Sequence, residues 1–193
     1  MTQPPARHGY GGAMRAIHWI TLALLVGAYA LAWSIDGASS RDQAAWLRMV
    51  HRSFGLTILL LTVIRLGWRQ VSPAPALPDS MPWAQRIAAK GVAILLYVLL
   101  FLQPLLGLAA SQAHGDRVGF FGLWTLPSVM ATDRALSRQL FALHGTVALV
   151  LLALIALHAG AALHHHFIRR DDLLRGMLPS LRRSPGQSDL PGV

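Results

Sequence analysis

The chain has 193 residues, of which 54% are hydrophobic and only 13% are charged, with a mean hydropathy of +0.46. A soluble domain usually carries about 25% charged residues, so this composition disfavours a water-exposed globule and excludes disorder over most of the length. The net charge of +9 is typical of a membrane protein whose arginines face anionic lipid, and the lack of cysteine excludes disulfides, iron–sulfur clusters and covalently attached c-type haem.

Four windows are long and apolar enough to cross about 30 Å of bilayer hydrocarbon as helices. They are residues 16–35, 49–68, 91–110 and 140–163. Four prolines within residues 71–83 predict a loop between the second and third windows. The predicted fold is therefore an all-α membrane protein, an antiparallel four-helix transmembrane bundle. It divides into an N-terminal segment (1–15), a four-span domain (16–168) and a C-terminal tail (169–193).

The basic residues predict the orientation of the chain. If both termini are cytoplasmic, eleven Lys and Arg residues fall on the cytoplasmic side and five on the outer side, as the positive-inside rule favours. The first window also resembles a signal peptide with a small-residue cleavage site at Ala28–Ala30. Because its apolar run continues to Ile35 and carries His18 near its start, we favour a retained helix.

Four histidines lie within the predicted spans, where polar side chains are costly and usually functional. His144 and His158 are 14 residues apart in the fourth span, which corresponds to about 21 Å of rise and nearly the same helix face. The topology places His18 at the cytoplasmic level of His158, and His51 at the outer level of His144. Two pairs of imidazoles from different helices are therefore predicted, His18 with His158 and His51 with His144.

Paired imidazoles without cysteine suit two non-covalently bound b-type haems, each with two axial histidines on its iron. Bonding to iron also satisfies a polar ring that would otherwise be unpaired in lipid. Gly55 and Gly145 are small enough to let a macrocycle approach the backbone, although small residues also serve plain helix packing. Zinc is the rival, but it would need about four ligands converging on one point.

The remaining histidines and three arginines have less specific interpretations. His165, seven residues after His158, is the best substitute ligand, and the flanking His164 and His166 are expected at the membrane surface. No specific role is assigned to His8 or His114. Guanidinium groups near the predicted ligands are candidates for binding haem propionates, although they also serve as topology markers. These candidates are Arg15, Arg48 and Arg52.

These features closely resemble the prokaryotic cytochrome b561 family of small di-haem, four-helix, quinone-linked cytochromes. The resemblance runs from about Arg15 to Pro179. It rests on Ile17-His18-Trp19, Met49-Val50-His51, Leu143-His144-Gly145, Leu157-His158-Ala159, Ala162-Leu163-His164-His165 and the tail Asp172-Leu173-Leu174-Arg175-Gly176-Met177-Leu178-Pro179. It implies His18, His51, His144 and His158 as axial ligands in the same two pairs, with His164 and His165 not ligands. It also implies a bacterial inner membrane location and electron exchange with ubiquinone.

The leading functional hypothesis is an electron-transferring cytochrome that links an outer donor to membrane quinone. One family type oxidises superoxide, and outer-side arginines could steer that anion. These arginines are Arg41, Arg48, Arg52, Arg117, Arg134 and Arg138. The alternative is a cytochrome b anchor and electron acceptor for a separate dehydrogenase or hydrogenase, with the predicted outer loop, residues 111–139, as a haem cap or docking site. A haem-free transporter ranks last, because no Asp or Glu lies deep in a span.

Overall fold

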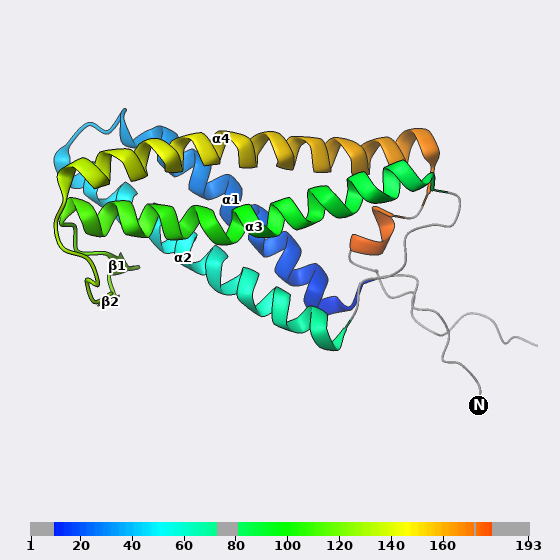
Figure 1. Ribbon diagram of the computed structural model, residues 1–193, viewed down its shortest axis with the longest axis horizontal. Coiled ribbons are helices and arrows are strands. Elements are labelled where there is room, and N and C mark those ends of the chain that lie inside the picture. The colour runs from blue at the N-terminus through cyan, green and yellow to red at the C-terminus, as the bar shows by residue number, and fades with distance from the viewer. Residues whose placement is uncertain (1–9, 73–80, 172, 179–193) are drawn as a thin grey trace, which may run out of the picture.

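The computed structural model describes residues 10–72, 81–171 and 173–178. Four long helices run alternately up and down along one axis (Figure 1). Each contains one of the predicted windows and extends beyond it at one or both ends. The helices are α1 (Gly12–Ile35), α2 (Arg41–Val71), α3 (Trp83–His114) and α4 (Arg134–His164). All four are long and apolar enough to cross a membrane, as the sequence predicts.

Polar capping residues explain why the helices begin outside the apolar windows. The side chain of Ser40 accepts a hydrogen bond from the backbone N–H of Gln43 at the start of α2. Asp133 does the same for two backbone N–H groups at the start of α4. At its C-terminal end α3 stops at Gly115, which adopts the left-handed conformation with φ of 93°. These caps satisfy backbone groups that the helices themselves leave unpaired.

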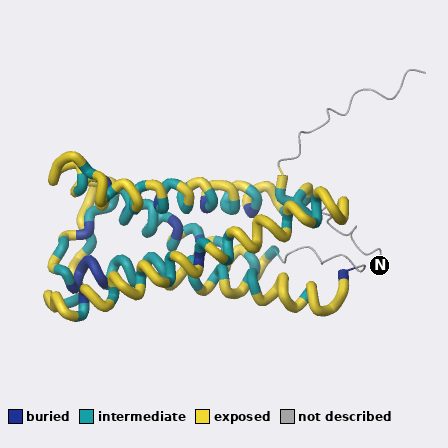
Figure 2. Tube along the Cα trace, turned by 90° about the horizontal axis from the view of Figure 1, so that it is seen from above, coloured by how far each residue is buried: buried dark blue, intermediate teal, exposed yellow. Residues whose placement is uncertain are grey.

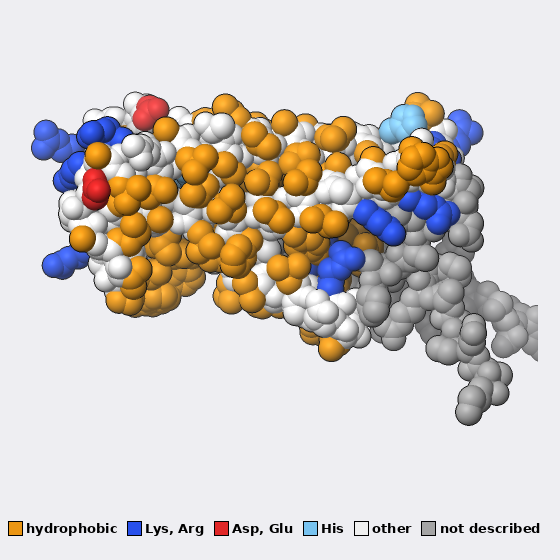
Figure 3. Space-filling view, in the orientation of Figure 1, with side chains coloured by type: hydrophobic (Ala, Val, Ile, Leu, Met, Phe, Trp, Pro, Cys, Tyr) orange, Lys and Arg blue, Asp and Glu red, His pale blue; other side chains and the backbone are white. Residues whose placement is uncertain are grey.

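The outer surface of the bundle is apolar along its middle and basic at its two ends (Figure 3). Many of the helical residues are exposed, and large apolar side chains such as Val26, Leu60 and Leu149 are among them (Figure 2). An apolar belt of this kind is stable in lipid rather than in water. Residues buried between helices are often small: Ser137 is 1% exposed, and its hydroxyl donates to the carbonyl oxygen of Ala110 across the α3–α4 contact at 3.0 Å.

The bundle consists of two helix pairs, α1 on α2 and α3 on α4, joined mainly by packing of α2 on α3. One end holds the start of α1 and the 3-10 turn η2 (Arg175–Met177), and we call it the terminal end. Towards this end α2 diverges from α3, and η2 lies at the opening (Figure 1). The backbone N–H of Tyr10 donates to the carbonyl oxygen of Gly176 there. The tail thus returns to the start of the chain.

The opposite end, the hairpin end, holds the loop between α3 and α4. This loop contains two short antiparallel strands, β1 (Gly119–Phe120) and β2 (Trp124–Thr125), in which Gly119 pairs with Thr125. The prediction of a loop over residues 111–139 is wrong at both ends, because α3 continues to His114 and α4 starts at Arg134. The connection is therefore shorter and more ordered than its polar sequence indicates.

Candidate functional site

The structure brings together the two histidine pairs that the topology predicts. At the hairpin end His51 of α2 faces His144 of α4, with ring centroids 6.3 Å apart. At the terminal end His18 of α1 faces His158 of α4, with ring centroids 6.4 Å apart. We call these the hairpin pair and the terminal pair. Both join one helix of the α1–α2 pair to α4, so each spans the seam between the two helix pairs.

The spacing within each pair fits a metal ion between two imidazoles. A metal–imidazole bond is about 2 Å long, and a ring centroid lies about 1 Å behind its nitrogen, so one ion between two such rings separates their centroids by about 6 Å. The two observed separations match this value. Among the described residues no group of three or more His or Asp side chains converges on one point, which is the arrangement that a structural zinc site requires.

Backbone carbonyls orient both rings of the hairpin pair. Nδ1 of His51 lies 2.8 Å from the carbonyl oxygen of Ala28 on α1, and Nδ1 of His144 lies 3.1 Å from the carbonyl oxygen of Gln103 on α3. A carbonyl oxygen can only accept, so each Nδ1 carries the proton and each Nε2 presents a lone pair. This is the second hydrogen bond that metal-binding histidines normally make. Gln103 also donates from Nε2 to the carbonyl oxygen of His144 at 2.9 Å, which ties α3 to α4 here.

One glycine of α3 shapes the surroundings of His144. A Cβ atom on Gly107 of α3 would lie 3.0 Å from Cε1 of His144, so only glycine lets the ring sit where it does without displacement. Gly145 has open space where its Cβ would be. Gly55 packs at ordinary distance against Pro104 instead, 3.8 Å from its would-be Cβ, so it serves helix contact in this structure. Gly107 was not among the glycines singled out from the sequence.

A tyrosine crosses the seam between the two helix pairs, at a level between the two histidine pairs. The hydroxyl of Tyr29 on α1 donates to the carbonyl oxygen of Ala148 on α4 at 2.6 Å. Ala148 lies one turn after His144, and His158 follows nearly three turns later. Tyr29 therefore fixes the distance between α1 and α4 at a level between the two pairs.

The three arginines proposed as propionate partners have different surroundings. Arg15 donates from its guanidinium to the carbonyl oxygen of Leu178 in the tail at 2.7 Å. Arg52 forms an ion pair with Asp116 in the loop at the hairpin end. Arg48 is exposed on α2. Two of the three guanidinium groups are thus occupied by protein acceptors, a result that the sequence did not reveal.

Asp116 is the centre of a network of charged and polar side chains at the hairpin end. Its second carboxylate oxygen lies 2.9 Å from Nδ1 of His114, and Nε2 of His114 accepts from the guanidinium of Arg134 at 2.6 Å. This series of side-chain contacts runs from Arg52, beside His51, to Arg134 at the start of α4. Burial alone would raise the pKa of the Asp116 carboxyl, but the hydrogen bonds from His114 and Arg52 and the charge of Arg52 outweigh it and lower that pKa. His114 therefore has a defined place, although no role was assigned to it from the sequence.

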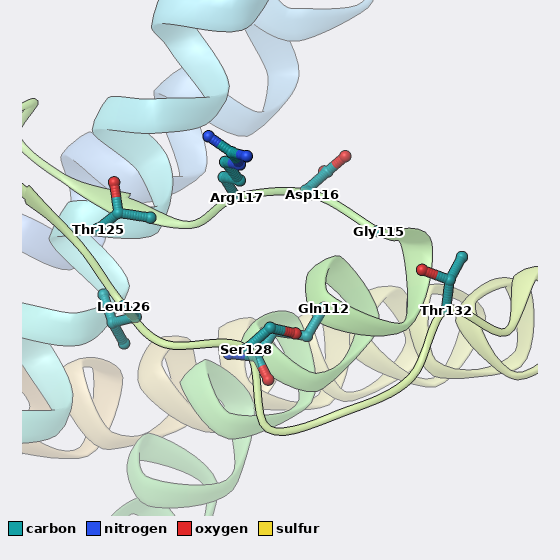
Figure 4. A pocket seen from close by; sticks show the side chains of 8 residues that line it. All are labelled: Gln112, Gly115, Asp116, Arg117, Thr125, Leu126, Ser128 and Thr132. Atoms are coloured by element: carbon teal, nitrogen blue, oxygen red, sulfur yellow. The ribbon is translucent and has the colours of Figure 1, made fainter.

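The loop at the hairpin end packs over Ser53 and Phe54 of α2. The backbone N–H of Phe121 donates to the hydroxyl of Ser53 at 2.8 Å, and the rings of Phe54 and Phe121 pack with centroids 6.1 Å apart. Beneath the loop is a cavity of about 440 Å³ lined in part by Gln112, Asp116 and Arg117 (Figure 4). The loop thus caps the bundle near the hairpin pair and leaves a polar cavity at its surface.

The remaining histidines lie at the terminal end of α4. Nδ1 of His165 lies 2.5 Å from a carboxylate oxygen of Asp171, so this ring, the best substitute ligand, has a protein partner of its own. His165 begins the π-helical turn η1 (His165–Arg169), which follows α4 directly. The rings of His164 and His165 contact each other edge to face with centroids 6.0 Å apart. His8 lies outside the described residues.

The four apolar helices and the histidine pairs between them are the architecture of a four-helix membrane cytochrome. The chain belongs to the prokaryotic cytochrome b561 family, whose model matches residues 9–180. It is 34% identical over 181 residues to cytochrome b561 homolog 2 of Escherichia coli, covering 92% of this chain and 94% of that protein. It is 32% identical over 170 residues to the probable superoxide oxidase CybB of Yersinia pestis (86% and 93%), and 30% identical over 183 residues to cytochrome b562 of Cereibacter sphaeroides (92% and 98%).

Membership of this family implies a b-type haem, and the residues present fit one. The imidazole separations and the free Nε2 atoms of the hairpin pair would let each pair of histidines hold the iron of such a group. His158 is exposed and His18 half-buried, so the terminal pair is the more open of the two. This openness coincides with the divergence of α2 from α3.

Proposed function

We propose that this protein holds two b-type haems and transfers electrons between a donor at the hairpin end and quinone in the membrane. The supporting observation is the placement of His144 and His158 on one face of α4, 14 residues apart, each opposite a histidine of another helix. The residues that would hold the two irons are His18 with His158 and His51 with His144. The rise between the two levels is about 21 Å, and the edges of two macrocycles would be much closer.

When bound, the haems supply one-electron redox chemistry at two levels of the bilayer. The chain's own residues hold them and control access to them. A histidine from each of two helices would hold each iron, and ligation by two histidines favours electron transfer over oxygen binding. The carbonyl oxygens of Ala28 and Gln103 fix the rings of His51 and His144. The loop at the hairpin end restricts the approach of solvent to that pair.

The proposed orientation places both termini in the cytoplasm and the hairpin end on the outer side of a bacterial inner membrane. The positive-inside distribution of Lys and Arg supports it. The polar cavity with Arg117 then opens on the outer side, where Arg134 and Arg138 add positive charge. In this scheme residues 16–168 form the membrane domain, between an N-terminal segment (1–15) and a C-terminal tail (169–193), both cytoplasmic.

Superoxide is the donor that we propose. The supporting observations are the relative described as a probable superoxide oxidase and the arginines at the hairpin end, whose field attracts a small anion. Two superoxide anions would each lose one electron and become O₂. One ubiquinone would take up these two electrons and two protons to form the quinol.

The test supplies superoxide and ubiquinone to the purified, haem-loaded protein. We expect quinol to form in a ratio of one per two superoxide anions, faster than with haem-free protein. Quinone reduction no faster than in the haem-free control would contradict superoxide oxidation. Co-purification with a separate redox subunit, together with no turnover of the isolated chain, would instead support a cytochrome b anchor for a dehydrogenase or hydrogenase.

A further inference from the structure

The helix α2 carries an arginine at the level of the terminal pair. Arg65 follows His51 by 14 residues, the same interval that separates His144 from His158 on α4. Fourteen residues correspond to about 21 Å and return to nearly the same helix face. Helix α2 thus presents His51 at one level and Arg65 at the other. This position on α2 places Arg65 at the level of His18 and His158, within range of their rings.

Arg65 lies against a tyrosine of the next helix. Its Cζ atom is 5.4 Å from the ring centroid of Tyr97 on α3, and Cζ of Arg69, one turn further along α2, is 5.7 Å from the same centroid. Two guanidinium groups therefore share one aromatic ring, an arrangement that stabilises each cation but satisfies none of its N–H donors.

Two polar atoms in this cluster lack a protein partner. Nε of Arg65 and the hydroxyl of Tyr97 are both buried, and neither has a hydrogen-bond partner among the described residues. An unpaired buried donor loses the hydrogen bond that water would make with it, and the loss costs more when its group is charged. Such atoms in a native site normally bind a ligand or ordered water.

Among the residues that the structure describes, no acidic side chain forms an ion pair with Arg65. All eight acidic residues are aspartates, and none falls in the spans at 16–35, 49–68, 91–110 or 140–163. Asp116, the partner of Arg52, lies in the loop at the opposite end of the bundle. Asp171, at the terminal end, pairs with His165. A membrane arginine with no carboxylate partner among the described residues indicates an anionic ligand.

We propose that Arg65 and Tyr97 form a carboxylate-binding site for a propionate of the haem held between His18 and His158. The guanidinium fork matches a carboxylate in two parallel hydrogen bonds, and the phenol O–H adds a further donor. This inference rests on the proposed function. It replaces Arg15, whose guanidinium donates to the tail, as the principal propionate partner at this level.

A cation beside a propionate stabilises the reduced haem relative to the oxidised one, because reduction removes one positive charge from the iron. The test is a spectroelectrochemical titration of the haem-loaded protein with four variants. Arg65→Met removes the charge at similar length, Arg65→Lys keeps the charge without the fork, and Tyr97→Phe removes only the hydroxyl. Lys90→Met is the matched control, since it removes one exposed cation from the same end of the bundle.

We expect two haem potentials in the wild-type protein. Arg65→Met lowers one of them and leaves the other unchanged, Arg65→Lys lowers the same one less, Tyr97→Phe lowers it slightly, and Lys90→Met changes neither. An unchanged pair of potentials in Arg65→Met, or an equal fall in both, would overturn the site. Should Arg65→Met fail to fold, Arg65→Lys and Tyr97→Phe decide the question by the same criterion.

Haem dimethyl ester, in which both propionates are esterified, separates a propionate from any other anion. Wild-type apoprotein should retain native haem at the terminal pair more tightly than Arg65→Met does, and the two should retain the ester equally. A difference in retention that persists with the ester means that Arg65 binds another anion, such as a lipid phosphate, and contradicts the proposal. A wild-type protein with a single haem would instead overturn the two-haem function. If that single haem were lost in His51→Ala, it would belong to the hairpin pair, and the carboxylate site would fail as well. If it were lost in His18→Ala, the carboxylate site could still be tested on it.

Discussion

Gly107 of α3 lies directly against the imidazole of His144: a Cβ atom at this position would be 3.0 Å from Cε1 and 3.2 Å from Nδ1 of the ring. Gly107→Ala therefore requires the ring to shift by a few tenths of an ångström, and Gly107→Val requires more. We expect Gly107→Val to lose the haem of the hairpin pair and Gly107→Ala to weaken it, in line with the roughly 1–3 kcal/mol cost of overpacking.

The haem content of purified protein checks this prediction. Gly91→Ala is the matched control, because it lies on the same helix and its Cβ would meet no atom within 4 Å. Full haem content in Gly107→Val would show that His144 moves without consequence and would count against its role as a ligand.

The ion pair of Arg52 and Asp116 ties α2 to the loop at the hairpin end. Asp116→Asn leaves the guanidinium of Arg52, whose side chain is only 17% exposed, without its counter-ion. We expect a loss of about 1–2 kcal/mol, between the values for exposed and buried pairs. Thermal unfolding in detergent measures it, with Asp42→Asn, an exposed site in the first turn of α2, as control.

The contribution of Asp116 depends on pH in a defined direction. Its pKa in the folded protein is lowered from the ordinary value of 3.8, so its stabilising effect is complete above 3.8 and is lost as the pH falls through the folded-state pKa. The difference in unfolding temperature between wild type and Asp116→Asn should be full at about pH 5 and shrink at about pH 3. A difference that grows on acidification would contradict this assignment.

The tail is held to the terminal end by two side chains of α1. Trp19 donates from Nε1 to the carbonyl oxygen of Met177 at 2.9 Å, and Arg15 donates to that of Leu178 at 2.7 Å. Trp19→Phe removes the first bond and keeps the ring, so amide hydrogens of residues 173–178 should exchange with solvent about tenfold faster, which corresponds to about 1.4 kcal/mol. Trp33→Phe, at an exposed indole on the same helix, should leave this exchange unchanged.

Much of this architecture follows from local sequence rules. Apolar length predicts the four helices, and the interval between His144 and His158 together with the alternating topology predicts both histidine pairs. The arginine roles did not follow, because the partner of Arg52 is 64 residues away in a loop and that of Arg15 is a backbone carbonyl 163 residues away. The 14-residue interval between His51 and Arg65 could have indicated the position of Arg65. It was missed because Arg65 was counted only as one of the cytoplasmic basic residues.

The central claim is that two imidazole pairs each hold one haem, and haem stoichiometry in the purified protein tests it most directly. We expect two b-type haems per chain, measured as the pyridine haemochrome against protein concentration. His18→Ala and His158→Ala should each leave one haem with one spectrum, and His51→Ala and His144→Ala should each leave one haem with the other. A colourless protein, a single haem in the wild type, or equal loss of both haems in all four variants would contradict the account.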